Sequence, residues 1–357
     1  MKKLTRERNS NIELLRIICM LGIIIGHCWN PVMGGGANYL GSNNIYIFYF
    51  IISMSSCAVN LFVLISGYFM SQTNTRNLIK PILLLVQVIL FKLGGFGIKM
   101  LFGVSFSGIE FIKCFVPNNY FVLLYIVLYV ISPYINIVIQ RLNLIQWKQM
   151  LVMILFLFSV FPTMVDFAGE IMGMELIGLS TIGLYGSQWG YTIINFMMMY
   201  ILGAYIHINE RKWEIGRIIF GIGVCGIILT LWSRLNDYTG YFTEKSAVEY
   251  CNPIIILLAI LIFEFASSFL EKHNEIVNVL AKGAFSVFLF QNEIIKYLPM
   301  KNIMEGNEIV IVIKLLLVAG SIYLCGWGIG GIYRLFENKL ELILKKICKN
   351  FELQYPQ

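Results

Sequence analysis

The chain has 357 residues, of which 58% are hydrophobic and 13% are charged, and its formal net charge is +7. Soluble domains carry about 25% charged residues, so this composition excludes a soluble globular protein and predicts an all-α bundle of transmembrane helices. The basic residues are scattered at the ends of apolar segments, which is typical of topology signals, so we expect no nucleic-acid binding. The eight cysteines form no Cys-x-x-Cys pair and no cluster with histidine, so we expect neither a metal site nor a disulfide framework.

Apolar segments of about 20 residues, the length that a bilayer core requires, recur along the whole chain. We predict about ten spans, with no room for a second folded soluble domain. The predicted spans are 11–29, 46–69, 79–101, 119–140, 149–166, 190–208, 214–233, 252–270, 283–299 and 309–332. Most lysines and arginines fall into cytoplasmic loops when the N-terminus is placed in the cytoplasm, which predicts that both ends of the chain lie inside.

The first apolar segment carries an arginine and a histidine within a helix of membrane length. Its sequence begins with Ser10 and Glu13 at the spacing of a capping box, with Ser10 as the expected N-cap. Arg16 and His27 are eleven residues apart, which places them on one helix face and roughly 16 Å apart along the axis. Such residues cost free energy inside a membrane, so the pair points to function. We expect Arg16 near the cytoplasmic boundary and His27 near the outer one.

Each of these residues also has a purely structural interpretation. Arg16 is close enough to the inner end of the helix to extend to the headgroups, or else it binds the phosphates of an anionic cofactor. His27 is either a hydrogen-bonded structural residue or a general base, the role that imidazole fills near neutral pH. Arg76 and Lys80 follow the second span as topology charges or as part of a cytoplasmic anion site. In the second span itself, Asn60, Ser66 and Gly67 are small or polar residues that favour close helix packing.

Three segments together resemble a known family. They are RNSNIELLRIICMLGIIIGHCW at 8–29, with its Arg-x10-His spacing, NLFVLISGYF at 60–69 and YFVLLYIVLYVISPYIN at 120–136. The chain is similar in these segments to the acyltransferase 3 family, and residues 196–206 and 283–292 look like later landmarks of that family. The resemblance implies ten membrane helices in a single membrane acyltransferase domain over 1–357. It also implies the use of acetyl-CoA or another acyl-CoA to acylate hydroxyls of surface glycans.

By this resemblance His27 would be the catalytic histidine and Arg16 its partner in the motif, with Arg16, Arg76 and Lys80 available to the acyl-CoA. The sequence departs from the family at two places. Many members have an Arg-x-Arg pair after the second span, where this chain has only Arg76 and Lys80. The ninth span often ends in Tyr-Leu-x-His, where this chain has Gln291.

The leading hypothesis is therefore an O-acetyltransferase of the bacterial cytoplasmic membrane, with the bilayer and a glycan or lipid-linked oligosaccharide as partners and no metal. The sequence predicts no particular oligomeric state. A transporter or flippase of lipid-linked oligosaccharides is the main alternative, but such proteins often show internal repeats and matched broken helices, which are not evident here. A glycan polymerase is a third possibility; such proteins tend to have a large basic outer loop, and the predicted outer loops here are poor in arginine.

Overall fold

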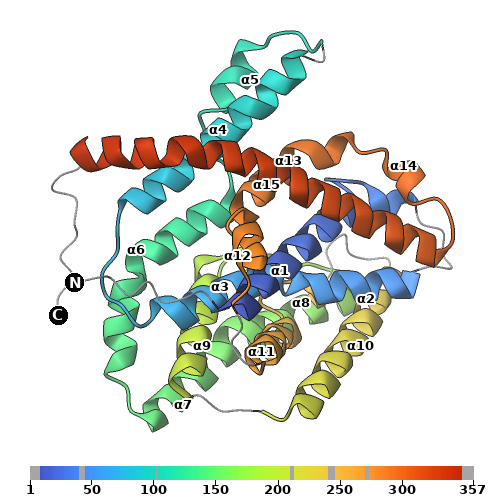
Figure 1. Ribbon diagram of the computed structural model, residues 1–357. Helices are drawn as coiled ribbons and strands as arrows, with labels where there is room; N and C mark the ends of the chain where they lie inside the picture. Colours follow the sequence, from blue (N-terminus) through green and yellow to red (C-terminus); the bar gives the residue numbers. More distant parts are fainter. Residues whose placement is uncertain are drawn as a thin grey trace.

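The computed structural model describes residues 9–39, 45–101, 103–209, 213–239, 246–269 and 273–347. These residues form α-helices joined mostly by short turns, with a longer connection between residues 173 and 192, and no strand occurs among them (Figure 1). The helices are α1 (Ser10–Trp29), α2 (Ile45–Ser56), α3 (Ala58–Met70), α4 (Ile79–Leu101), α5 (Gly108–Lys113), α6 (Tyr120–Gln140), α7 (Leu144–Leu155), α8 (Phe161–Met172), α9 (Ile193–Asn209), α10 (Ile215–Thr239), α11 (Pro253–Ser267), α12 (Glu275–Ala281), α13 (Ala284–Ile294), α14 (Met300–Ile303) and α15 (Glu308–Ile347).

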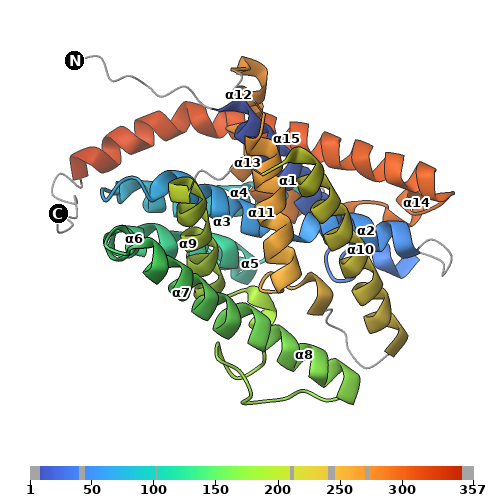
Figure 2. The same cartoon turned by 90° about the horizontal axis from the view of Figure 1, so that it is seen from below.

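The prediction of an all-α polytopic membrane protein is confirmed. In the described ranges, eight helical segments are long and apolar enough to cross a membrane, and α9 is a shorter apolar helix. The eight are Ser10–Trp29, Tyr46–Met70, Ile79–Leu101, Tyr120–Gln140, Leu144–Met172, Ile215–Leu235, Ser246–Ser267 and Glu308–Lys346. Figure 2 shows α15 on one side of the bundle and the continuous α7–α8 helix on the other.

The segment predicted as a span at 283–299 differs from the others. It contains α13, a helix of only eleven residues, followed by the short 3-10 turn Ile295–Tyr297. Eleven helical residues extend over about 16 Å, roughly half the thickness of a bilayer core. Lys282 and Gly283 separate α13 from α12, so neither of the two short helices is long enough to cross a bilayer by itself.

Helix α1 lies in the middle of the bundle and packs against α2, α3, α11, α12, α13 and α15 (Figure 1). The prediction of Ser10 as its N-cap is wrong by one residue, because Asn9 caps the helix and its side chain accepts from the backbone N–H of Asn11 at 3.0 Å. The Ser10 hydroxyl instead donates to the side-chain oxygen of Asn278 in α12 at 3.0 Å. This bond fastens the beginning of α1 to the helix that precedes α13.

Small residues allow the closest helix contacts, as predicted for Gly67. A Cβ atom on Gly67 of α3 would collide with the carbonyl oxygen of Tyr200 in α9. In α15, a Cβ atom on Gly326 would lie 2.8 Å from the Cα atom of Val287, and Gly330 lies against Ser286 in the same way. Glycines therefore set the separation of α13 and α15, and so the position of α13 against the rest of the bundle.

Two turns cover the C-terminal end of α1. The backbone N–H of Gly34 donates to the carbonyl oxygen of His27 at 3.1 Å, so the chain folds back over the end of the helix. Gly36 in this turn lies against the side chains of Met300 and Met304, which follow α13 and are almost completely buried. The end of α1 is thus enclosed by chain segments from both ends of the sequence.

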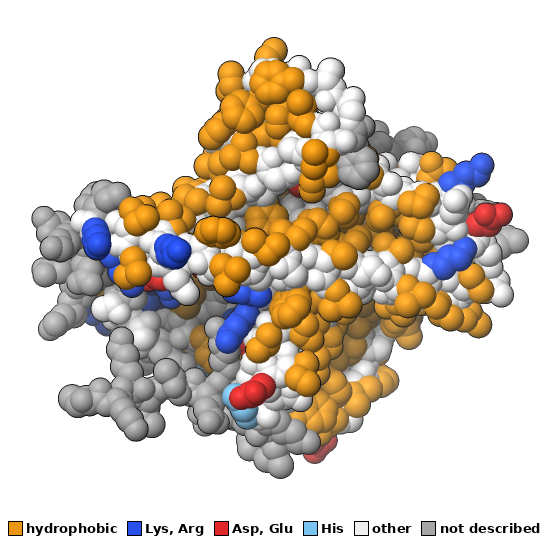
Figure 3. All heavy atoms as spheres, turned by 45° about the horizontal axis from the view of Figure 1, so that its top comes forward, with side chains coloured by type: hydrophobic (Ala, Val, Ile, Leu, Met, Phe, Trp, Pro, Cys, Tyr) orange, Lys and Arg blue, Asp and Glu red, His pale blue; other side chains and the backbone are white. Residues whose placement is uncertain are grey.

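The outer surface of the bundle is mainly apolar. Figure 3 shows one face on which hydrophobic side chains predominate and charged side chains are few. On α15, large apolar side chains such as Leu317 and Leu335 are 66% and 72% exposed. A surface of this kind fits contact with lipid tails better than contact with water.

Candidate active site

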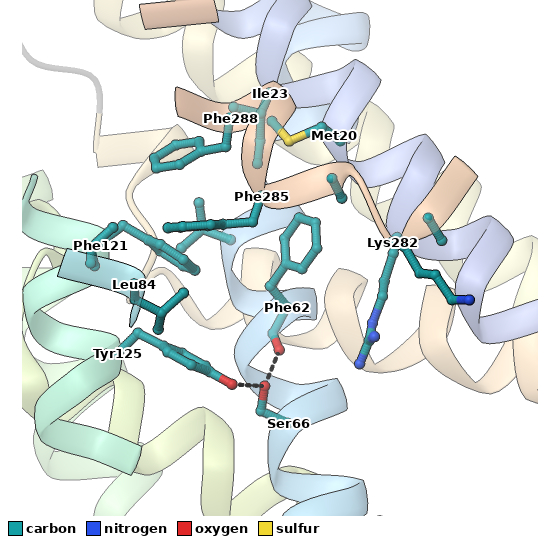
Figure 4. Close-up of a pocket in the computed structure, with 15 residues that line it drawn as sticks. Met20, Ile23, Phe62, Ser66, Leu84, Phe121, Tyr125, Lys282, Phe285 and Phe288 are labelled. Atoms are coloured by element: carbon teal, nitrogen blue, oxygen red, sulfur yellow. Dashed lines mark hydrogen bonds between the residues drawn. The ribbon is translucent and has the colours of Figure 1, made fainter. Parts of the chain in front are cut away.

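A cavity of about 350 Å³ lies between α1, α3, α4, α6 and the α12–α13 segment. Aromatic side chains form much of its wall, as Figure 4 shows for Phe62, Phe121, Tyr125, Phe285 and Phe288. A hydrogen bond of 3.5 Å from the hydroxyl of Ser66 to that of Tyr125 adds a polar spot to this wall. The cavity is therefore a mostly apolar space inside the helix bundle.

Two cations contribute to the lining of this cavity. Arg16 comes from α1, where it forms an ion pair of 3.3 Å with Glu13 and its side chain is 31% exposed. Lys282 comes from the break between α12 and α13, and Figure 4 shows it to one side of the aromatic wall. Lys282 is one of the basic residues at the ends of apolar segments, and nothing in the sequence links it to Arg16. Two cations beside an apolar space are suited to a ligand with an anionic head and an apolar or extended arm.

The sequence predicts that Arg16 and His27 share one face of α1, and the structure agrees. Arg16, Met20 and Ile23 line the cavity at helical spacing, and His27 is the next residue of the same face. His27 and Arg16 do not touch, since their positions in the helix are roughly 16 Å apart along its axis. The imidazole therefore lies one turn beyond Ile23 and does not itself line the cavity.

The side chain of Gln291 in α13 approaches His27. The two side chains interact, yet no hydrogen bond of good geometry joins them, and three of their atoms are buried without a partner. These atoms are Nδ1 of His27 and both Oε1 and Nε2 of Gln291, whose side chain is completely buried. The Asn278 contact with Ser10 and the Gln291 contact with His27 show that α1 and α13 run side by side in the same direction.

Arg76, predicted to bind the cofactor, lies in the turn between α3 and α4 and is 7% exposed. Its guanidinium stacks over the ring of Tyr129, 5.7 Å from the ring centre. All three of its nitrogens donate to uncharged oxygens: Ser132 Oγ at 2.9 Å, the Thr73 carbonyl at 2.8 Å and hydroxyl at 3.0 Å, the Thr75 carbonyl at 2.8 Å, the Met70 carbonyl at 2.9 Å and the Tyr200 hydroxyl at 3.4 Å. Its role towards a cofactor stays a prediction, because in this arrangement its donors serve the protein itself.

A proline explains part of the position of Arg76. Pro133 lies inside α6 and has no N–H group to offer to the carbonyl oxygen of Tyr129, one turn earlier. The hydroxyl of Ser132 donates to that oxygen at 2.8 Å and in turn accepts from Nε of Arg76 at 2.9 Å. Arg76 therefore holds in place the Ser132 hydroxyl that satisfies the carbonyl oxygen left without a donor in α6.

Lys80, the other predicted cofactor-binding residue, is exposed and lines a neighbouring cavity of about 430 Å³. Glu337 and Glu341 of α15 line the same cavity, so its charge is mixed. Leu84 and Tyr125 line both cavities, so the two spaces adjoin. Lys80 is thus near the main cavity but does not line it.

Three carboxylates that no sequence motif marks form a separate cluster around α8. The hydroxyl of Ser187 donates to Glu249 at 2.7 Å, and its backbone N–H donates to Asp166 at 2.9 Å. The hydroxyl of Ser246 donates to Glu170 at 2.6 Å. In the part of the chain that the structure describes, no group of three such residues is arranged to hold a metal ion. These hydrogen bonds to serines explain the three carboxylates as structural residues that fix the chain following α8.

Comparison with known protein families supplies one further finding. The family model described as an acyltransferase domain, that of the acyltransferase 3 family, matches residues 9–330. The matched range contains the whole cavity as well as His27 and Gln291. No curated protein and no solved structure matches the chain.

Proposed function

Since this chain belongs to the acyltransferase 3 family and is a membrane acyltransferase, we propose that it transfers an acetyl group from acetyl-CoA to a hydroxyl of a cell-surface polysaccharide or its lipid-linked precursor. One observation supports this proposal above the others. Two cations line the cavity near the beginning of α1, and a partly accessible imidazole follows on the same helix face, one turn beyond the last lining residue of that helix. That arrangement suits a donor that has phosphates at one end and a reactive thioester at the other.

The donor binds with its phosphates at Arg16 and Lys282. An arginine presents several N–H groups in a planar fork that matches phosphate oxygens, and a lysine adds a point charge. The extended arm of the donor lies along the apolar wall formed by Phe62, Phe285 and Phe288. In the predicted orientation the cations face the cytoplasm, where acyl-CoA is available, and the thioester is directed towards His27.

His27 acts as the general base of the transfer. One imidazole nitrogen takes the proton of the acceptor hydroxyl while the hydroxyl oxygen attacks the thioester carbonyl carbon. The new C–O bond forms, the C–S bond breaks, and the leaving thiolate receives the proton from the imidazolium as free thiol. In a relay variant the imidazole itself is acylated first and then passes the acyl group to the acceptor hydroxyl. An acyl-histidine trapped in the absence of acceptor would identify the relay.

The experiment that tests the proposal measures transfer of labelled acetyl groups from acetyl-CoA to endogenous glycan in membranes. His27→Ala is compared with wild type at matched expression, and His273→Ala, which changes an exposed histidine, serves as the control. We expect the His27 variant to lose the label and the control to keep it. Label that survives His27→Ala would exclude His27 as the base.

A second measurement separates an acyltransferase from the transporter alternative. The purified protein is incubated with acetyl-CoA in detergent, without acceptor, and release of free thiol is followed. We expect slow hydrolysis that depends on His27, whereas a flippase should show none. A wild-type protein that transfers no label and hydrolyses no acetyl-CoA, but acts on a longer acyl-CoA, would contradict acetyl-CoA as the donor. That result would still support the acyltransferase reaction.

A further inference from the structure

Three buried polar atoms without partners meet at one place, between α1 and α13. They are Nδ1 of His27 and the two amide atoms of Gln291, which is 0% exposed. A buried polar atom without a hydrogen bond costs free energy, so most such atoms in native proteins are paired. Buried atoms without partners on two interacting side chains fit a reaction site whose hydrogen bonds close only when a substrate is bound.

The helix geometry places this pair one turn beyond the residues that line the cavity. Ala284 and Phe288 of α13 line the cavity, and Gln291 follows Phe288 by three residues on the same face. On α1, His27 follows the lining residue Ile23 by four residues, so each helix presents its polar residue one turn beyond the apolar wall. A thioester that has passed along the wall would meet both side chains together.

The surroundings of Gln291 argue against a purely structural role. A glutamine that holds two helices together is expected to use its amide in a closed hydrogen bond, as Gln87 does by donating to the Ser286 hydroxyl of α13 at 2.9 Å. Gln291 lies on the same helix α13, five residues after Ser286, and forms no such bond. The chain therefore keeps an unsatisfied amide in a position where an apolar side chain would pack at a lower cost.

Resting on the proposed function, we propose that Gln291 is a positioning residue for His27 in acyl transfer. Its amide oxygen accepts the Nδ1–H group of His27 when donor and acceptor are bound, which leaves the other ring nitrogen, Nε2, as the base that takes the hydroxyl proton. We assign the hydrogen to Nδ1 because this nitrogen is buried without another partner and Gln291 interacts with the ring. The glutamine thus fixes both the ring orientation and the nitrogen that reacts.

The test compares Gln291→Met, Gln291→Glu and the matched control Gln87→Met, with kcat, the acetyl-CoA KM and the melting temperature measured for each purified protein. Methionine is similar in size to glutamine but cannot accept the Nδ1–H group. For Gln291→Met we expect kcat to fall about 10- to 100-fold with the KM little changed. We expect its melting temperature to stay the same or to rise, because an unsatisfied buried amide has been removed.

The control variant should show the opposite pattern. Gln87→Met removes a closed hydrogen bond to Ser286, so we expect a lower melting temperature with kcat unchanged. In Gln291→Glu the carboxylate still accepts Nδ1–H, so we expect kcat to recover in part relative to the methionine variant. Its negative charge favours the protonated imidazole, so the lower limb of the kcat/KM profile should move to higher pH.

Two results would overturn the role of Gln291 while leaving the proposed function intact. One is a wild-type kcat in Gln291→Met, and the other is an equal kcat in the glutamate and methionine variants. In both cases His27→Ala must still abolish transfer, which shows that the acyltransferase reaction itself is present. A wild-type protein that transfers no acetyl group, or a fully active His27→Ala variant, would instead contradict the proposed function itself. These two results are therefore distinct from those that contradict the role of Gln291.

Discussion

Arg16 and Arg76 have similar positions in the sequence, since each is a cation at the inner end of a predicted span, yet their surroundings differ. Arg16 is 31% exposed, lines the cavity and forms one ion pair with Glu13. Arg76 is 7% exposed and donates from all three nitrogens to neutral oxygens of the protein. The difference shows that the free donors of a cation, rather than its charge or its position in the sequence, decide whether it can receive a ligand.

The largest effect is expected from Arg76→Met. The substitution leaves several buried oxygens without donors and removes the partner of Ser132 in α6, so we expect the free energy of unfolding to fall by about 3 kcal/mol or more. The melting temperature of the purified protein in detergent measures this loss. An unchanged melting temperature together with a raised acetyl-CoA KM would instead support the cofactor-binding role predicted from the sequence.

Arg16→Met should affect binding rather than folding. We expect the acetyl-CoA KM to rise about tenfold, because a charged hydrogen bond to phosphate is lost, while the melting temperature changes little. Steady-state kinetics measure the effect, with Arg217→Met as the control because Arg217 forms a similar but exposed pair with Glu214 at 3.0 Å. A fall in kcat with no change in KM would mean that Arg16 acts in the transition state instead.

Lys282→Met should have a smaller effect of the same kind. Lys282 is exposed, so its attraction for phosphate is screened, and we expect the acetyl-CoA KM to rise about three-fold. The rise should shrink as salt is added, since screening already weakens the wild-type interaction. Lys148→Met, at another exposed lysine, is the control, and an equal rise in both variants would contradict a specific role for Lys282.

Lys80→Met should have the smallest effect. Lys80 shares its cavity with Glu337 and Glu341 and only adjoins the main cavity, so we expect the acetyl-CoA KM to rise no more than about two-fold. The double variant Glu337→Gln/Glu341→Gln tests the reason, since removing the carboxylates should leave Lys80 freer to attract the donor and lower the KM. A KM raised tenfold by Lys80→Met would move the phosphate site to the neighbouring cavity.

Local patterns were sufficient to predict eight of the ten spans and the shared face of Arg16 and His27, because hydrophobic length and helical spacing are properties of a single segment. The predicted spans 190–208 and 283–299 contain shorter helices instead. The start of α1 was missed by one residue, because the hydroxyl of Ser10 is engaged by Asn278 of a distant helix. The contact of His27 with Gln291 joins residues that are 264 positions apart, and it depends on the register of α13 against α1. Lys282 approaches the cavity for the same reason, so neither could be found from spacing in the sequence.

The cover over the end of α1 determines how an acceptor can arrive. Irregular backbone at membrane depth is tolerated where protein surrounds it, and here the turn after Trp29 and the segment after α13 close over His27. Met300 and Met304 are part of this cover, and under the proposed function an acceptor that approaches from that end would meet it. Methionine side chains are unbranched and change rotamer easily. Rotation of these two side chains would therefore change the cover while the helices that hold His27 and Gln291 stay in place.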